Sequence, residues 1–470
     1  MTQPATKLPE KAPVADRPPA SLREELRANP AKKSMLVFLC VVGLFLLLFT
    51  GLWLRSLPQL LYSGDQHARN IHKTTLPDDV ENTPPLNALV NNNAPPLLLT
   101  GAGSILYESQ NSIYKLPIVG GKPQSLLTPG YVYTPSIVPL LTTSDQLLYS
   151  GDGLWLTDIA TDMPVQVAKL ASGQIITSMV LSSDDTTIAW STEPLNGKGS
   201  IDLYLTSLAP ASFAQTTLIY QQSASQCPCF RAFSFLEEPG VPAHSLLLLT
   251  DDQGDHDAIR TGLWIFDLRE KLTATPQQIL SENALQGPLA LMSHSTTLLY
   301  ASAEGVAPQP TDGSVPEDLV ALNHANGLNM ASLSGNPPVL TQIHTVLSAQ
   351  NELSNSADYH WISTPLFSPD GHTLVYLEFS SDAQAPFDRH YAVYSVQVKT
   401  QGGKLQVGQP QLLATSLANF VTLGAWMNSS VVTFYSSNAL YAMDVHTGAM
   451  TLITKTAAYA RAIAVVQGQT

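Results

Sequence analysis

Charge and cysteine are both scarce in this chain. Only 13% of its 470 residues are charged, whereas soluble proteins carry roughly 25%. Its 3 cysteines are too few to staple a protein of this length with disulfide bonds. The 37 acidic residues outnumber the 23 basic ones, and the net charge of -14 excludes a nucleic-acid binder that works through a broad basic surface. A hydrophobic fraction of 44% excludes disorder throughout and allows one large domain or two to three ordinary ones.

One segment, Met35–Leu54, contains no charged residue over 20 positions. A helix of that length spans about 30 Å, the thickness of the hydrocarbon core of a bilayer. The run is longer than the apolar region of a signal peptide, and Arg55-Ser56-Leu57-Pro58 follows it in place of a small-residue cleavage site. The segment therefore predicts an uncleaved transmembrane signal anchor, which makes the lipid bilayer a partner of the protein.

The charges beside this anchor predict its direction. Residues 1–34 hold seven basic and four acidic side chains, a net +3, which leaves -17 for the rest of the chain. The positive-inside rule keeps such an N-terminus in the cytoplasm. We expect a mostly disordered cytoplasmic tail over residues 1–34 and a single-pass cell-membrane protein whose C-terminal part lies outside the cytoplasm. Residues 55–95, with proline pairs and no sustained period, predict an extracytoplasmic tether.

From residue 96 to residue 467, short strand-like runs alternate with turn clusters. One unit recurs, in which a first strand carries a bulky pair and a second strand carries a pair that is usually aliphatic and aromatic. The first-strand pairs are Leu106-Tyr107, Leu148-Tyr149, Ala189-Trp190, Leu248-Leu249, Leu299-Tyr300, Val375-Tyr376 and Thr433-Phe434. The second-strand pairs are Ile113-Tyr114, Leu154-Trp155, Leu203-Tyr204, Leu263-Trp264, Leu319-Val320, Val393-Tyr394 and Leu440-Tyr441. The mean spacing, near 54 residues, exceeds the roughly 40–50 of four-stranded propeller blades, and loop insertions account for the excess.

The pattern predicts an all-β fold: a single β-propeller of about seven four-stranded blades, with six or eight as alternatives, preceded by one transmembrane helix. A lone four-stranded sheet leaves both of its faces exposed to solvent. Packing several such sheets around an axis buries the faces of each sheet against its neighbours. The final strand of a unit is expected near Leu126-Leu127-Thr128, and later ones near residues 278–280, 339–341, 412–413 and 452–454. Tyr459–Val466 has no partner strands after it, so it is predicted to close the ring by completing the first unit.

The sequence Phe367–Tyr376, which contains Ser368-Pro369-Asp370-Gly371, resembles the turn of WD40-like propeller repeats of the TolB type. Looser copies occur at Ser182–Asp185, Ser293–Thr296 and Met427–Ser430, and Thr250–Asp255 looks like the acidic loop that follows such a strand. The resemblance covers roughly residues 96–467 and implies a propeller. Members of this family are mostly binding platforms of the bacterial envelope, and some are domains of hydrolases, so the fold does not fix the function.

No established catalytic motif occurs in the sequence: there is no Gly-x-Ser-x-Gly, no His-Glu-x-x-His and no phosphate-binding loop. The densest group of metal-ligating residues surrounds His256 and consists of Asp251, Asp252, Asp255 and Asp257. Such carboxylates can hold Ca²⁺, although the EF-hand spacing fails because Gly262 stands where that motif needs a glutamate. The alternatives are a calcium site and a solvated acidic hairpin loop; no other cofactor is expected.

Two of the cysteines, Cys227 and Cys229, are separated by one proline in the part predicted to lie outside the cytoplasm, where thiols oxidise. They can form a disulfide, act as a redox pair, or remain two thiols in a loop.

The sequence favours a binding module over an enzyme. The leading hypothesis is a membrane-tethered extracytoplasmic propeller that binds a protein, peptide or glycan at the cell surface and no nucleic acid. One alternative is a propeller enzyme of the lyase, lactonase or glycosidase type with a site at the axis. Carboxylates or histidines that converge on the axis from several blades would favour this alternative. A second alternative is a transmembrane sensor that signals through its short tail.

Overall fold

The computed structural model describes residues 97–467 except 101, 135–136, 209–214, 226–227, 238–243, 252–261, 270–274, 281–285, 303–325, 350–357, 383–384, 402–403 and 418–420. The predicted tail, the anchor Met35–Leu54 and the tether lie outside the described residues. The chain divides into two units, Met1–Glu81 and Asn82–Thr470, and every described residue belongs to the second. Among those residues, no helix has the length and apolar character needed to cross a bilayer.

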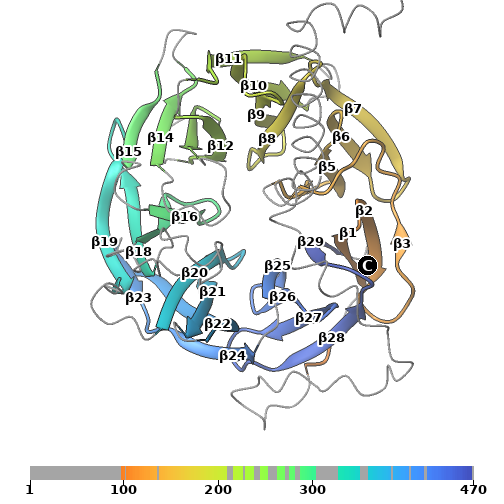
Figure 1. Cartoon of the computed structure of the whole chain (residues 1–470), viewed down its shortest axis with the longest axis vertical. Helices are drawn as coiled ribbons and strands as arrows, with labels where there is room; N and C mark the ends of the chain where they lie inside the picture. Colours follow the sequence, from red (N-terminus) through yellow and green to blue (C-terminus); the bar gives the residue numbers. More distant parts are fainter. Residues whose placement is uncertain are drawn as a thin grey trace, which may run out of the picture. The chain divides into compact units, whose positions relative to one another are not determined.

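Seven β-sheets stand around a common axis and form a propeller (Figure 1). Blade 1 contains β29 (Ala460–Gln467), β1 (Gly103–Ser109), β2 (Ser112–Pro117) and β3 (Gln124–Ser125); blade 2 contains β4 (Leu140–Leu141), β5 (Gln146–Ser150), β6 (Gly153–Asp158) and β7 (Met163–Lys169). Blade 3 contains β8 (Gln174–Leu181), β9 (Thr187–Pro194), β10 (Ser200–Ser207) and β11 (Thr216–Ser223); blade 4 contains β12 (Phe230–Phe235), β13 (Leu246–Asp251), β14 (Gly262–Asp267) and β15 (Gln277–Leu280). Blade 5 contains β16 (Gln286–Leu291), β17 (Thr297–Ser302), β18 (Gly327–Ser334) and β19 (Val339–Leu347).

Blade 6 contains β20 (Asp358–Phe367), β21 (Thr373–Asp382), β22 (Ala385–Gln401), β23 (Lys404–Val407) and β24 (Gln411–Leu417); blade 7 contains β25 (Val421–Asn428), β26 (Val431–Ser436), β27 (Ala439–Asp444) and β28 (Met450–Lys455). The long strand β22 pairs with β24 through His390–Ser395 in its middle and with β23 along its last part, so this blade carries an extra hairpin. In each blade the strands are antiparallel neighbours, and Figure 1 shows β29, β8, β12, β16 and β25 closer to the axis than β3, β11, β15, β19 and β28.

Apolar side chains fill the interface between each blade and the next. Between blades 2 and 3, Leu148, Leu154 and Trp190 belong to one buried cluster. Blades 7 and 1 meet in the same way, through a cluster that includes Val431 and Ala462. These aliphatic and aromatic positions are the ones that gave the sequence its repeating pairs, because both faces of every sheet are buried against a neighbour.

One hydrogen bond recurs in all seven blades. An aliphatic residue at the end of the third strand donates its backbone N–H to a carbonyl at or just before the start of the second strand. The donors are Ile118, Ile159, Leu208, Leu268, Leu333, Val398 and Val445. The blades are therefore copies of one local structure, although their sequences differ widely.

The turns at Ser182 and Ser368 share a second set of hydrogen bonds. Each buried serine donates its Oγ–H to an aspartate two residues later, Asp184 or Asp370, and its Oγ accepts the N–H of the residue five positions later. The side chain thereby fixes the tight turn that joins the first and second strands.

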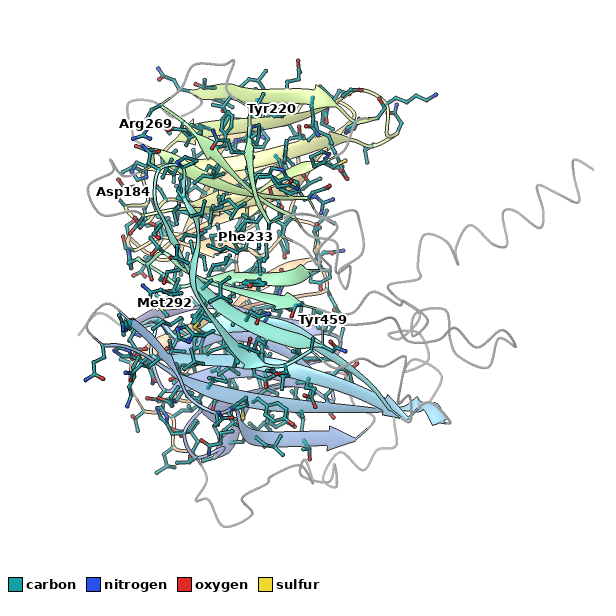
Figure 2. The ribbon with its side chains drawn as sticks, turned by 90° about the vertical axis from the view of Figure 1, so that its left-hand side faces the viewer. Asp184, Tyr220, Phe233, Arg269, Met292 and Tyr459 are labelled. Carbon is teal, nitrogen blue, oxygen red and sulfur yellow. The ribbon has the colours of Figure 1, made fainter. Side chains whose placement is uncertain are left out.

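Connections between consecutive antiparallel strands alternate between the two ends of a blade, which gives the propeller two different faces. The turns between first and second strands and between third and fourth strands form one end, which we call the turn face. The turns between second and third strands and the connections from one blade to the next form the other end, which we call the loop face. Figure 2 shows Asp184, Met292 and Arg269 of the turn face toward one side and Tyr459 of the loop face toward the opposite side.

The seven-bladed, all-β architecture confirms the prediction and removes the six- and eight-bladed alternatives. Every first-strand pair lies in the second strand of its blade, from β1 to β26, counting from the axis. The expected closing strand is β29, which pairs with β1 and completes blade 1.

Two details of the prediction were wrong. The third strand of blade 5 is β18, in which Met330 stands opposite Leu299, whereas the pair assigned to it, Leu319-Val320, lies outside the described residues. The last strand of blade 1 is Gln124–Ser125, just before the expected Leu126-Leu127-Thr128, because Tyr114 pairs with Ser125. A long insertion in the first case and a two-residue strand in the second hide the period that the sequence analysis relied on.

Candidate functional site

The loop face carries an ion pair at the seam where the ring closes. Glu108, on β1, stands directly opposite Arg461, on β29; Arg461 donates a hydrogen bond from Nε to Glu108 Oε1, and its Nη2 forms a salt bridge with the same oxygen. Tyr131, from the connection between blades 1 and 2, donates its hydroxyl hydrogen to Glu108 Oε2. Glu108 is 1% exposed, and the partners of its carboxylate come from two other segments, β29 and the connection between blades 1 and 2.

Three tyrosine rings extend from this ion pair across the seam. We call Tyr133, Tyr459 and Tyr435 the tyrosine platform. The Tyr133 and Tyr459 rings meet edge to face with centroids 5.6 Å apart, and Tyr459 and Tyr435 meet likewise at 5.0 Å. The Arg461 guanidinium lies 5.7 Å from the centroid of the Tyr133 ring, within the range of a cation–π contact.

Two asparagines stand at the ends of the tyrosine platform. Asn111, in the β1–β2 hairpin, accepts the backbone N–H of Tyr133 on its Oδ1 at 2.9 Å. Asn438, in the β26–β27 hairpin, accepts the Tyr435 hydroxyl on its Oδ1, also at 2.9 Å. Both asparagines are exposed and have positive φ, 61° and 59° respectively, the conformation that two-residue hairpins require.

Backbone contacts hold the tyrosine platform in place as well. The Ser109 hydroxyl donates to the carbonyl oxygen of Tyr459 at 2.9 Å and so ties the start of β29 to the end of β1. Tyr133 and Tyr459 are half-buried, whereas Tyr435 is buried. The platform is therefore a supported aromatic surface with two partly exposed rings.

Burial dominates the electrostatics of this region. It raises the pKa of the Glu108 carboxyl, against the opposing effects of Arg461 and Tyr131. Burial acts to lower the pKa of Arg461, but Glu108, Tyr459 and Tyr133 outweigh it and raise that pKa. Burial also raises the pKa values of Tyr131 and Tyr133, and it raises that of Tyr435 to about 12. These three hydroxyls therefore stay protonated at neutral pH.

The first strands of the blades, which lie nearest the axis, carry few charged residues in six of the seven blades. The first strands of six blades, β29, β4, β8, β12, β16 and β25, contain no Asp, Glu or His, and their charged residues are Arg231 and Arg461. Arg231 lies 3.8 Å from a carboxylate oxygen of Glu193, and Arg461 is paired with Glu108. Asp358 and His360 belong to the seventh, β20. Over the described residues, no three Asp, Glu, His or Cys side chains group as metal ligands.

The predicted calcium ligands fall on both sides of the described boundary. Asp251 ends β13, is fully buried, and accepts the backbone N–H of Cys229 on Oδ1 at 2.9 Å. Asp252, Asp255 and Asp257 lie outside the described residues. The calcium hypothesis stays a prediction, and Asp251 has a structural role beside it, because it anchors the connection between blades 3 and 4.

Of the two neighbouring cysteines, Cys229 is among the described residues and Cys227 is not. Cys229 is disulfide-bonded. Cys227 and Cys40 lie outside the described residues, so the pairing with Cys227 stays a prediction.

Sequence reasoning did not find the ion pair or the tyrosine platform. Glu108 and Arg461 are 353 positions apart, and the tyrosines come from three different connections and strands. One signal was available: Arg461 interrupts the apolar closing strand, and pairing that strand with the first one places an acid opposite it. That signal can be used only after the ring closure has been predicted.

Comparisons with known proteins gave distant matches to solved structures. No protein-family model matches the chain, and no curated protein matches it. An oligogalacturonate lyase in complex with manganese is 15% identical, with 76% of this chain and 86% of that chain covered and a TM-score of 0.46. A putative TolB from Agrobacterium tumefaciens is 14% identical, with 67% and 91% covered and a TM-score of 0.35. An oligogalacturonate lyase from Vibrio parahaemolyticus is 12% identical, with 76% and 87% covered and a TM-score of 0.40.

The chain is thus similar to propellers named as lyases and to one named as TolB. At these identities and TM-scores the likeness supports no conclusion about function. The function has to be argued from the residues of this chain.

Proposed function

We propose that this protein is a membrane-anchored, extracytoplasmic β-propeller of TolB-like type that binds a protein, peptide or glycan ligand on its loop face. The observation that carries the proposal is the tyrosine platform, a partly exposed aromatic surface held in place by a buried ion pair and two hairpin asparagines. Exposed tyrosines on a rigid support are typical of recognition surfaces, because they present a large contact area at a small cost in conformational entropy.

The position of the chain ends supports the choice of face. Gly103, the first residue of β1, pairs with Gln467, the last residue of β29, at the turn face. A tether that precedes β1 joins the propeller there, and the loop face lies at the opposite end. The membrane anchor Met35–Leu54 and its orientation rest on the sequence alone.

The chemistry of six of the seven first strands supports binding over catalysis. An axial enzyme of the lyase, lactonase or glycosidase type needs carboxylates, imidazoles or a metal at the axis. The six first strands other than β20 contain no Asp, Glu or His, and their two arginines are each placed against a carboxylate of a second strand. The sensor alternative has no observation in the described residues to support it.

Site-specific photo-crosslinking tests the choice of face. Val132 lies beside Tyr133 on the loop face and is 58% exposed, whereas Val119 lies on the turn face and is 63% exposed. A photoreactive residue is placed at either position in the full-length chain in its native membrane. Specific crosslinks to an extracytoplasmic ligand from position 132 and none from position 119 are expected. Equal crosslinking at both positions, or crosslinks from position 119 alone, overturns the proposal.

A further inference from the structure

We propose that the tyrosine platform binds an uncharged carbohydrate, with sugar rings on Tyr133 and Tyr459 and sugar oxygens on the amides of Asn111 and Asn438. This inference rests on the proposed function and specifies its ligand. Three features of the site carry it: the fixed direction of the amides, the partly exposed aromatic rings, and the balance of charge around them.

The two amides present hydrogen-bond donors. A backbone N–H and a tyrosine hydroxyl hydrogen occupy Oδ1 of Asn111 and Asn438. An asparagine side chain carries its acceptor on one atom and two donors on the other, so holding Oδ1 fixes the direction of the NH2 group. Both residues are exposed. The site thus offers oriented donors at both of its ends, which suits a ligand rich in hydroxyl and ether oxygens.

The rings between these donors supply the apolar half of the contact. The Tyr133 and Tyr459 rings are partly exposed and meet edge to face, so their faces point in different directions. Hexopyranose rings have C–H faces that pack on aromatic rings while their hydroxyl edges form hydrogen bonds. A run of aromatic rings with amides at its ends fits more than one sugar unit, so an oligosaccharide is the expected ligand.

The charge around the site favours a neutral ligand over an acidic one. Among the described residues, Glu108 and Arg461 contact the platform tyrosines or lie next to them and pair with each other. Lys455, opposite Ala439, is a further charged residue beside Asn438. The four residues of the two hairpin turns are Gln110, Asn111, Ser437 and Asn438, all uncharged. An acidic sugar would find the guanidinium already occupied by a buried carboxylate.

Ligand-observed NMR with the full-length chain in detergent or nanodiscs tests the inference. The probes are chitopentaose, cellopentaose and maltopentaose at millimolar concentration, with trigalacturonate as the acidic comparison. We expect at least one neutral probe to bind and trigalacturonate not to bind. Asn111→Asp and Asn438→Asp keep the intramolecular acceptor and remove the outward donors, so each should weaken binding about tenfold. Tyr133→Ala should weaken it at least about tenfold, and Tyr133→Phe about threefold or less.

Asn428→Asp is the matched control. Asn428 lies in a turn-face turn and also accepts backbone N–H groups on its Oδ1, from Ser430 and Val431. This variant should bind the neutral probe as the wild type does, and the three asparagine variants and Tyr133→Phe should keep the wild-type unfolding midpoint.

The outcomes separate the two proposals. Absence of binding by every neutral probe overturns the carbohydrate inference, as does binding that the platform variants leave unchanged. If, instead, Val132 crosslinks a protein and the platform variants abolish that crosslink, the carbohydrate inference fails while the proposed function stands. If position 132 crosslinks nothing and no neutral probe binds the platform, the proposed function fails together with the carbohydrate inference.

Discussion

Glu108 and Arg461 lie opposite each other in the register of the two strands that close the propeller, although 353 positions separate them in the chain. The pair joins the last strand of the fold to the first, and Tyr131 adds a third segment to it. Removing one member of a buried pair leaves the other charge without compensation. The seam should therefore be sensitive to single substitutions and tolerant of paired ones.

The substitution Glu108→Gln should lower the free energy of unfolding by about 3–5 kcal/mol, because the guanidinium of Arg461 would remain buried without its counter-charge. Urea unfolding of the full-length chain, followed by tryptophan fluorescence, measures the loss. The double variant Glu108→Leu/Arg461→Met should lose less than Glu108→Gln does, since it buries no charge. The exposed pair of Glu237 with His294 is the control, and Glu237→Gln should change stability by about 0–1 kcal/mol. An equal loss for Glu108→Gln and Glu237→Gln would contradict this reading of the seam.

Gly371 should resist substitution for two separable reasons. Its φ is +71°, and a Cβ added there would come within 2.7 Å of the Met292 sulfur in the neighbouring blade. Gly197 has a φ of +64° and nothing within 4 Å of such a Cβ. Gly197→Ala should cost about 1 kcal/mol for the backbone conformation alone. Gly371→Ala should cost about 1–3 kcal/mol more, because the contact between blades 5 and 6 must shift. Equal midpoints for the two variants in thermal unfolding would show that this contact adds nothing.

Asp184 should contribute stability that acid removes. Partial burial acts to raise the pKa of Asp184, but hydrogen bonds from Thr186, Ser182 and His244 outweigh it and lower the pKa to about 2. An unfolded aspartate has a pKa of about 3.9. A lowered pKa in the folded state gives stability that is present above the unfolded pKa and is lost as pH falls through the folded pKa.

The difference in urea midpoint between the wild type and Asp184→Asn should therefore be constant from about pH 7 to about pH 5 and shrink between about pH 4 and about pH 2. A difference that stays constant over the acidic range would mean that the turn does not depend on the ionised carboxylate.

The disulfide of Cys229 should join it to Cys227. Digestion without reduction should yield a peptide that contains both residues, lighter than the reduced peptide by two hydrogen masses and unreactive toward a thiol-alkylating reagent. Reduction should restore two alkylation sites. A peptide that links Cys229 to Cys40 would contradict the prediction.

Met35–Leu54 should hold the full-length chain in the membrane through alkaline carbonate extraction. Replacing Val42 and Leu46 by Arg places two charges within the apolar run, at a cost of about 2.5–3.5 kcal/mol each near the centre of a helix. The variant should move to the soluble fraction, whereas Val42→Leu/Leu46→Val should remain with the membrane. Protease added from outside should remove the propeller and leave the N-terminal tail intact.

The strand pattern of this protein could be predicted because it is local. Pairs such as Leu148-Tyr149 and Leu440-Tyr441 repeat at a blade-like spacing, since every sheet buries both faces against its neighbours. The same reasoning identified the closing strand, because a final strand without local partners must pair with the first unit. The prediction failed at β18, where the long segment before the strand breaks the period on which the reasoning depends.

The sequence by itself determined the all-β class, the seven repeated units and the closure of the ring, because these follow from the alternation of apolar residues and turns along the chain. Tertiary structure alone decided which side chains meet at the seam. Arg461 faces Glu108 through the register of two strands from opposite ends of the propeller, and Tyr133, Tyr435 and Tyr459 come together only when blades 7 and 1 are side by side. Contacts between such distant positions depend on the closed ring, and no local pattern of residues encodes them.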